Sequence, residues 1–144
     1  MKNKIDILSK KEMLTLIEKG VPQNAFVISF YTPGGFPIRC PEINNRLYSV
    51  ALHDIDLAVL PDFGLTPETY FPEAPELASL IDNAVSMGMD IICQCDYGQS
   101  RSAACAAAIL EYYEKSGIQI FADYRYYPNQ LVFNKILDAL NKAV

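Results

Sequence analysis

Apolar residues along the chain form short continuous runs that alternate with longer amphipathic stretches. The runs are rich in β-branched and aromatic residues and predict buried strands at Ala25–Tyr31, Leu47–Leu52 and Asp90–Cys95. Elsewhere, apolar residues recur at helical spacing and predict helices at Lys10–Lys19, Pro72–Met87, Arg101–Lys115 and Asn129–Val144. This alternation predicts an α/β fold with a mostly parallel central sheet of about four strands and helices on both faces.

Capping residues set the expected bounds of several helices. Ser9 is an N-cap candidate with Glu12 as its capping-box partner, and Gly20 is expected to end the first helix. Gly117 is expected to close the third helix. The aromatic-rich segment Ile118–Tyr127 fits no single assignment.

Length and charge narrow the possible functions. The chain has 144 residues, no repeat and no linker-like segment, which predicts one domain over residues 1–144. Its net charge of −5 argues against nucleic acid and anionic membrane surfaces as partners. No apolar stretch approaches the roughly 20 residues of a membrane span, and no apolar run follows the basic start. We therefore expect a cytoplasmic protein.

The cysteines are expected to be reduced thiols in that compartment. With His53 as the only histidine and no Cys-x-x-Cys pair, we expect neither a metal site nor a cofactor. Cys93 and Cys105 are expected to be core thiols, with Cys93 on the strand face opposite Cys95. Cys40 is an alternative as a resolving thiol for Cys95.

The segment C-D-Y-G-Q-S-R-S at 95–102 carries the most specific chemistry. It places Cys95 at the end of a buried strand and Arg101 at the start of a helix. A connection this short must curl, so its backbone N–H groups and the helix N-terminus form an anion-binding nest. Arg101 can bind two phosphate oxygens, and Gly98 permits a positive φ or a close approach. The expected phosphate-binding residues are Asp96, Tyr97, Gly98, Gln99, Ser100 and Arg101.

Cys95 is the candidate nucleophile. In such a positive field we expect it to be largely thiolate, and the nest would hold a phosphate against it. The combination predicts a phosphocysteine intermediate, stabilised by Arg101 and the loop amides. The Ser102 hydroxyl stands where it could donate to the departing thiolate.

This Cys-x5-Arg-Ser motif, between an apolar strand and an Ala-rich helix, resembles the signature of the protein tyrosine phosphatase superfamily. Its late position resembles the dual-specificity branch, especially the small bacterial proteins known as predicted tyrosine phosphatases. Tyr127-Pro128-Asn129-Gln130 resembles a Pro-Asn element of that group. The resemblance follows the element order from Ala25 to Leu140, and its specific part is the eight residues 95–102. It implies a dual-specificity phosphatase-like fold.

The resemblance also implies a general acid, an aspartate that protonates the leaving oxygen. Asp54 is the first candidate, because Leu52-His53-Asp54-Ile55 resembles the Phe-Asp-Asp-hydrophobic element of the bacterial group. Asp62, which lies 33 residues before Cys95, is the first alternative and Asp56 the second.

The leading hypothesis is a metal-independent hydrolase of phosphomonoesters that acts on a phosphorylated protein or a small phosphomonoester. Gln94 stands where the family usually has histidine, and Asp96 adds a negative charge beside the nucleophile. These departures motivate an alternative, a catalytically weak pseudophosphatase that binds phosphorylated ligands. A rhodanese-like sulfurtransferase or an arsenate reductase is a third hypothesis. The choice among phosphotyrosine, phosphoserine, phosphoinositide and metabolite substrates stays open.

Overall fold

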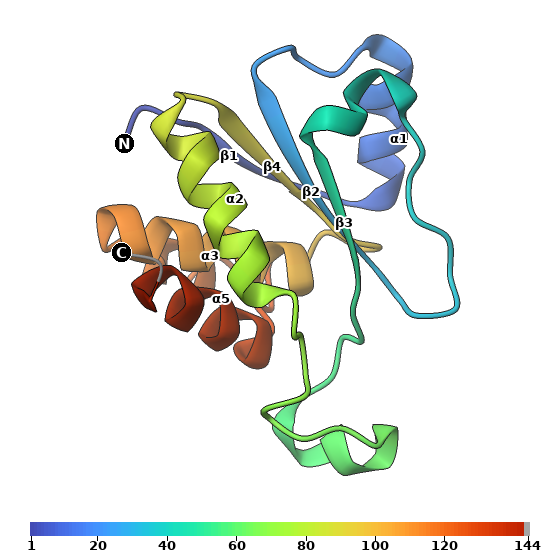
Figure 1. Ribbon diagram of the computed structural model, residues 1–144, viewed down its shortest axis with the longest axis vertical. Helices are drawn as coiled ribbons and strands as arrows, with labels where there is room; N and C mark the ends of the chain where they lie inside the picture. Colours follow the sequence, from blue (N-terminus) through green and yellow to red (C-terminus); the bar gives the residue numbers. More distant parts are fainter. Residues whose placement is uncertain (143–144) are drawn as a thin grey trace.

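The computed structural model describes residues 1–142 and contains a four-stranded sheet in the order β1-β4-β2-β3, in which every pairing is parallel (Figure 1). The strands are β1 (Ile5–Leu8), β2 (Ala25–Tyr31), β3 (Leu47–Ala51) and β4 (Asp90–Gln94). The predicted α/β fold, with a parallel sheet flanked by helices, is confirmed.

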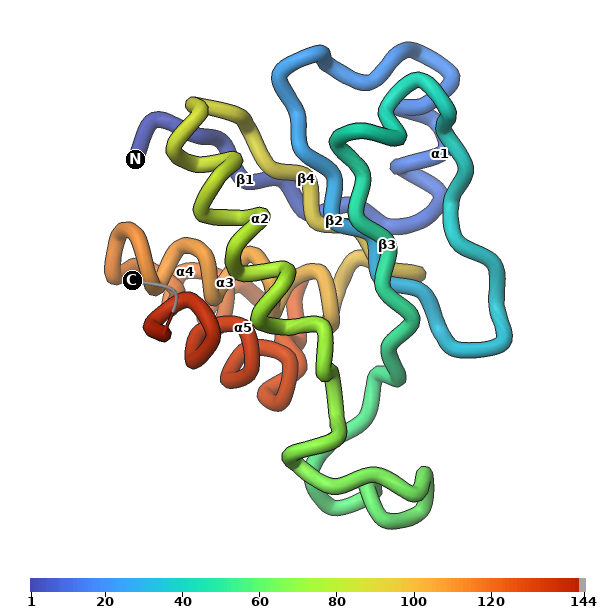
Figure 2. The backbone as a smooth tube through the Cα atoms, in the orientation of Figure 1, coloured from blue at the N-terminus to red at the C-terminus, as the bar shows by residue number. Residues whose placement is uncertain are grey.

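Helices cover both faces of the sheet. They are α1 (Lys10–Lys19), α2 (Ala74–Ser86), α3 (Arg101–Glu114), the short α4 (Ile118–Phe121) and α5 (Gln130–Lys142), with 3-10 helices η1 (Pro41–Arg46) and η2 (Leu57–Phe63). The tube in Figure 2 shows α1 on one side of the sheet and α2, α3 and α5 on the other. No helix within residues 1–142 is long and apolar enough to cross a membrane.

The two faces of the sheet bury separate apolar clusters. Every second residue along the central strands, including Ile28 and Ile91, packs into the larger core with α2, α3 and α5. The residues between them, including Val27 and Ile92, pack beneath α1. Cys93 and Cys95 both belong to the larger core, so the prediction that they face opposite ways was wrong. Residues two apart on a strand share a face.

Strand β1 was not predicted from the sequence. It has only four residues, with the exposed Asp6 in its middle, and lies at the edge of the sheet. Its pairing partner is β4, with Ile5 opposite Ile91 and Ile7 opposite Cys93. The extended conformation of such a short strand depends on pairing with its neighbour, and its own residue pattern contributes little.

The predicted bounds of α1, α2 and α3 lie within two residues of the observed ones, and Gly20 ends α1 as predicted. The Ser9 side chain accepts from the Glu12 backbone N–H at 3.1 Å, and the Glu12 carboxylate accepts from the Ser9 N–H at 2.9 Å, so the capping box is confirmed. The stop at Gly117 was wrong, because α3 ends at Glu114 and Lys115 takes the left-handed conformation with φ 57°. The predicted last helix is α5, and residues 143–144 of that prediction lie outside the described residues.

Small side chains let α3 lie deep in the molecule. Every residue from Arg101 to Ile109 is buried, and five of them are alanines. The first turn of α3 follows the loop after β4, so close packing of this helix against the sheet and α5 also fixes the end of that loop.

Ala108→Leu should therefore destabilise the protein. The larger side chain would force α3 away from its neighbours, at a cost of about 1–3 kcal/mol in the free energy of unfolding. Urea denaturation measures this. Ala122→Leu, at an exposed position, is the control and should change the same quantity by less than about 0.5 kcal/mol. Equal effects of the two variants would contradict tight packing around α3.

Candidate active site

The loop of residues 95–100 leaves the carboxyl end of β4, the edge at which open α/β sheets bind ligands. Backbone hydrogen bonds hold it from both sides. The Lys10 N–H donates to the Asp96 carbonyl at 3.1 Å, and the Tyr127 N–H donates to the Gln99 carbonyl at 2.8 Å. The Asn129 N–H donates to the Ser100 carbonyl at 3.2 Å. The starts of α1 and α5 thus fix the loop.

Gly98 is required at its position for two reasons. Its φ is 69°, in the left-handed region. A Cβ added there would lie 2.7 Å from the Ser9 backbone nitrogen and 2.9 Å from the Leu8 carbonyl carbon. The loop therefore packs directly on the backbone that joins β1 to α1.

The candidate nucleophile Cys95 and the candidate donor Ser102 lie together. The Cys95 Sγ is 3.0 Å from the Ser102 Oγ, and the Cys95 residue is 2% exposed. Gln94, in place of the histidine of the family pattern, donates from Nε2 to the Cys95 carbonyl at 3.0 Å. Its Oε1 accepts from the Ser29 hydroxyl on the neighbouring strand. The amide therefore braces the start of the loop.

The Arg101 guanidinium is buried and only partly satisfied by protein groups. Its Nη1 donates to the Leu52 carbonyl at 2.7 Å and to the Thr32 Oγ1 at 3.3 Å. Its Nη2 donates to the Asp96 Oδ2 at 3.3 Å. Its Nε is buried without a hydrogen-bond partner among residues 1–142, although the residue is only 4% exposed. The Nε–H is therefore a buried donor that no described protein group satisfies.

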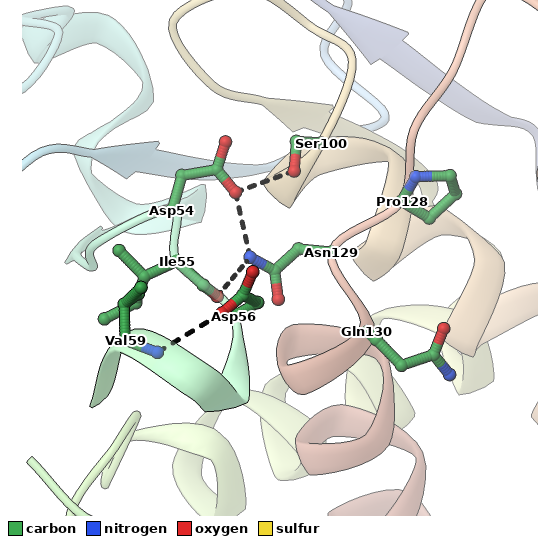
Figure 3. A pocket seen from close by; sticks show the side chains of 8 residues that line it. All are labelled: Asp54, Ile55, Asp56, Val59, Ser100, Pro128, Asn129 and Gln130. Carbon is green, nitrogen blue, oxygen red and sulfur yellow. Dashed lines mark hydrogen bonds between the residues drawn. The ribbon is translucent and has the colours of Figure 1, made fainter. Parts of the chain in front are cut away.

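Asp54 is bound directly to the loop. Its Oδ1 accepts from the Ser100 hydroxyl at 2.7 Å and from the Asn129 Nδ2 at 2.8 Å (Figure 3). Asn129 also donates to the Ile55 carbonyl at 3.0 Å, and its Oδ1 accepts from the Val132 N–H at the start of α5. One amide thus joins the segment of the acid candidate to α5. This role of Asn129 was not predicted.

The other two acid candidates lie differently. The Asp56 Oδ1 caps η2, where it accepts from the N–H groups of Ala58 and Val59 at 3.0 and 3.3 Å. Asp62 is exposed near the end of η2. A pocket of about 400 Å³ beside the loop is lined by Asp54, Ile55, Asp56, Val59, Ser100, Pro128, Asn129 and Gln130, and Asp62 is not among them. Of the three aspartates, Asp54 contacts the loop.

A buried tyrosine supports the backbone ahead of Asp54. The Tyr70 hydroxyl donates to the His53 carbonyl at 2.6 Å. Burial raises the pKa of the Tyr70 phenol well above its usual value, and the Asp54 carboxylate adds to the rise. The hydroxyl therefore remains a donor at neutral pH. Tyr70 carries no motif, and sequence reasoning missed it.

The remaining cysteines lie away from the loop opening. Cys40 packs in the cluster beneath α1, whereas Cys95 belongs to the core on the other face, and burial raises the pKa of the Cys40 thiol. Contact with Cys105 and burial raise the pKa of Cys93 well above its usual value. Within residues 1–142, no group of three His, Cys, Asp or Glu side chains is arranged to hold a metal ion.

Solved structures with the same fold include several phosphatases and a tyrosine phosphatase-like serine/threonine/tyrosine-interacting protein. The PTP-2 phosphatase of Cydia pomonella matches with a TM-score of 0.62 at 12% identity, over 96% of this chain and 87% of that one. Human DUSP28 matches with a TM-score of 0.59 at 13% identity, over 96% and 92%. PTPMT1, in a complex with PI(5)P, matches with a TM-score of 0.56 at 13% identity, over 96% and 91%. No protein-family model matches the sequence, and neither does any curated protein.

These matches show the fold of the dual-specificity branch of the protein tyrosine phosphatase superfamily. They cover nearly the whole chain, from β1 to α5. The fold expected from the Cys-x5-Arg-Ser motif is therefore confirmed.

Substitution of Gly98 should disturb both folding and anion binding. In Gly98→Ala the left-handed backbone costs about 1–2 kcal/mol, and the contact with Ser9 adds to it. Gly34→Ala is the control, because Gly34 also has a positive φ, of 91°, but open space around its Cβ. Urea denaturation and phosphate titration should show the larger loss for Gly98→Ala. A loss no greater than in the control would contradict the close approach of the loop to Ser9.

Proposed function

We propose that this protein is a metal-independent phosphomonoester hydrolase that acts through a phosphocysteine intermediate. In the first step the Cys95 thiolate attacks phosphorus, and the bond from phosphorus to the leaving oxygen breaks. The protonated Asp54 carboxyl gives its proton to that oxygen. Arg101 and the loop N–H groups hold the three equatorial oxygens.

In the second step water cleaves the phosphocysteine. The water oxygen attacks phosphorus while the Asp54 carboxylate takes a proton from that water. The bond from sulfur to phosphorus breaks. The Ser102 hydroxyl, 3.0 Å from Cys95 Sγ, donates a hydrogen bond to the departing thiolate. Inorganic phosphate leaves, and Asp54 is again protonated for the next turnover.

The buried Arg101 guanidinium with its unpartnered Nε is the observation that carries this proposal. A buried donor without a partner costs free energy unless a ligand satisfies it. Arg101 begins α3, whose N-terminus also favours an anion. A phosphate that meets this donor would be held in the loop that begins with Cys95 and carries the hydrogen-bonded Asp54.

Cys95→Ser should abolish the hydrolysis of p-nitrophenyl phosphate measured in EDTA. Replacing the thiolate by a hydroxyl removes the nucleophile, and we expect kcat/KM to fall by about 10⁴-fold or more. Cys40→Ser, on the other face of the sheet, is the matched control and should retain the wild-type rate. A wild-type rate that needs added metal, or that survives in Cys95→Ser, would refute the mechanism.

Asp54→Asn should lower kcat by about 10²- to 10⁴-fold, because no proton reaches the leaving oxygen. The loss should be larger with phenyl phosphate than with p-nitrophenyl phosphate, whose leaving group needs less protonation. Asp56→Asn and Asp62→Asn serve as comparisons. A larger loss in either one would transfer the acid role from Asp54.

A second candidate function is the binding of phosphorylated ligands without turnover. The Asp96 carboxylate on Arg101 favours it, because this carboxylate offsets the charge that must stabilise the transition state. A wild-type protein that binds inorganic phosphate but releases no nitrophenolate in a single-turnover experiment would be such a pseudophosphatase.

A further inference from the structure

Asp96 lies where its charge must act on any bound phosphate. Its Oδ2 accepts from the Thr32 hydroxyl at 3.2 Å and from the Arg101 Nη2 at 3.3 Å. Thr32 Oγ1 in turn accepts from the Arg101 Nη1 at 3.3 Å. Thr32 and Asp96 therefore bind the end of the guanidinium that carries Nη1 and Nη2, whereas Nε has no hydrogen-bond partner among residues 1–142. An anion bound at the Nε edge would have the Asp96 carboxylate as a close neighbour.

Two further carboxylates lie beside the loop, and the Arg125 cation is paired. Asp54 and Asp56 line the adjoining pocket. The Arg125 guanidinium is bound by Asp123 at 2.7 Å and lies over the Tyr126 ring, so its charge is compensated locally. Together with Asp96, these aspartates place three carboxylates within or beside the loop.

Aromatic rings accompany these carboxylates. Tyr97, within the loop, is 82% exposed. Tyr127 is 72% exposed, and its N–H donates to the Gln99 carbonyl of the loop. Exposed rings beside a polar site provide apolar contact for an aryl group. They fit the ring of a phosphorylated phenol better than they fit a polyol.

The charge of the Asp96 carboxylate then discriminates among phosphate esters by the charges that they carry beside the phosphate. A ligand with one phosphate can place it at the Nε edge of Arg101. A further anionic group on the same ligand would lie near Asp96, and like charges at such distances repel within the screening length. Basic groups beside the phosphate would instead be attracted.

We propose that Asp96 is a specificity-determining residue that selects phosphotyrosyl peptides with basic flanks and rejects polyanionic phosphates, such as inositol polyphosphates. This inference rests on the proposed function of the same site. Asp96 makes and breaks no bond in the reaction; its carboxylate sets which charges the substrate carries around the reacting phosphate.

The test compares two phosphotyrosine peptides of one sequence, with either lysine or glutamate on both sides of the phosphotyrosine, and inositol trisphosphate. The wild-type kcat/KM should be about tenfold or more higher for the lysine peptide, and inositol trisphosphate should be the poorest substrate. The ratio between peptides should shrink when the ionic strength rises from about 0.05 M to about 0.5 M.

Asp96→Asn keeps an oxygen acceptor for Thr32 and Arg101 but removes the charge. It should lower the lysine-to-glutamate ratio by about threefold or more. Asp96→Glu keeps the charge and should keep the preference. Asp138→Asn removes an exposed carboxylate on α5 and should leave the ratio unchanged.

Binding to Cys95→Ser protein separates this inference from the proposed function. In one outcome the wild type hydrolyses none of the substrates, Cys95→Ser binds the lysine peptide more tightly than the glutamate peptide, and Asp96→Asn weakens that preference. The inference then holds, and hydrolysis is refuted. If hydrolysis occurs with a ratio that neither Asp96→Asn nor salt alters, the inference is overturned and hydrolysis stands. Absence of both binding and hydrolysis overturns both.

Discussion

The buried guanidinium of Arg101 organises the end of the molecule that carries the loop. A buried charge costs several kcal/mol unless hydrogen bonds compensate it. Here the compensation comes from the Leu52 carbonyl, the Thr32 hydroxyl and the Asp96 carboxylate, which follow three neighbouring strands, β3, β2 and β4. Satisfying one side chain therefore fixes three strand ends relative to one another. The same contacts leave Nε without a partner, so the constraint that orders these segments also leaves the donor on which the proposed function depends.

The position of Asp54 depends on the packing of α5. Asn129 precedes α5 and holds both the Asp54 side chain and the Ile55 carbonyl, while Ser100 ties the same carboxylate to the loop. The helix α5 packs on the Ala-rich α3, which begins with Arg101. The acid candidate and the proposed anion site thus share one support, the packed pair α3 and α5. A shift of α5 on α3 would move the carboxylate relative to the loop without any change in the residues of the site.

The sequence predicted those parts of this arrangement that are local. Strands β2 to β4 are continuous apolar runs, the main helices have apolar residues at helical spacing, and the loop from Cys95 to Ser102 is contiguous. Strand β1 was missed because its four residues gain their conformation from pairing with β4. Asp54 was predicted from the family resemblance, since the residues alone left three aspartates as candidates. Thr32 and Tyr70 were not found, because each supplies one hydroxyl from a distant segment, and no local pattern marks such a contact.

Gln94 illustrates how a departure from a family pattern can preserve structure. The side chain is buried, and its amide has both a donor and an acceptor, which Cys95 and Ser29 use. An imidazole in that position would titrate near neutral pH, whereas an amide keeps the same hydrogen bonds at every pH. The substitution therefore removes a source of pH dependence while the loop remains braced. For this reason, the case for a binding-only protein depends on the charge that Asp96 places beside Arg101 more than on the absent histidine.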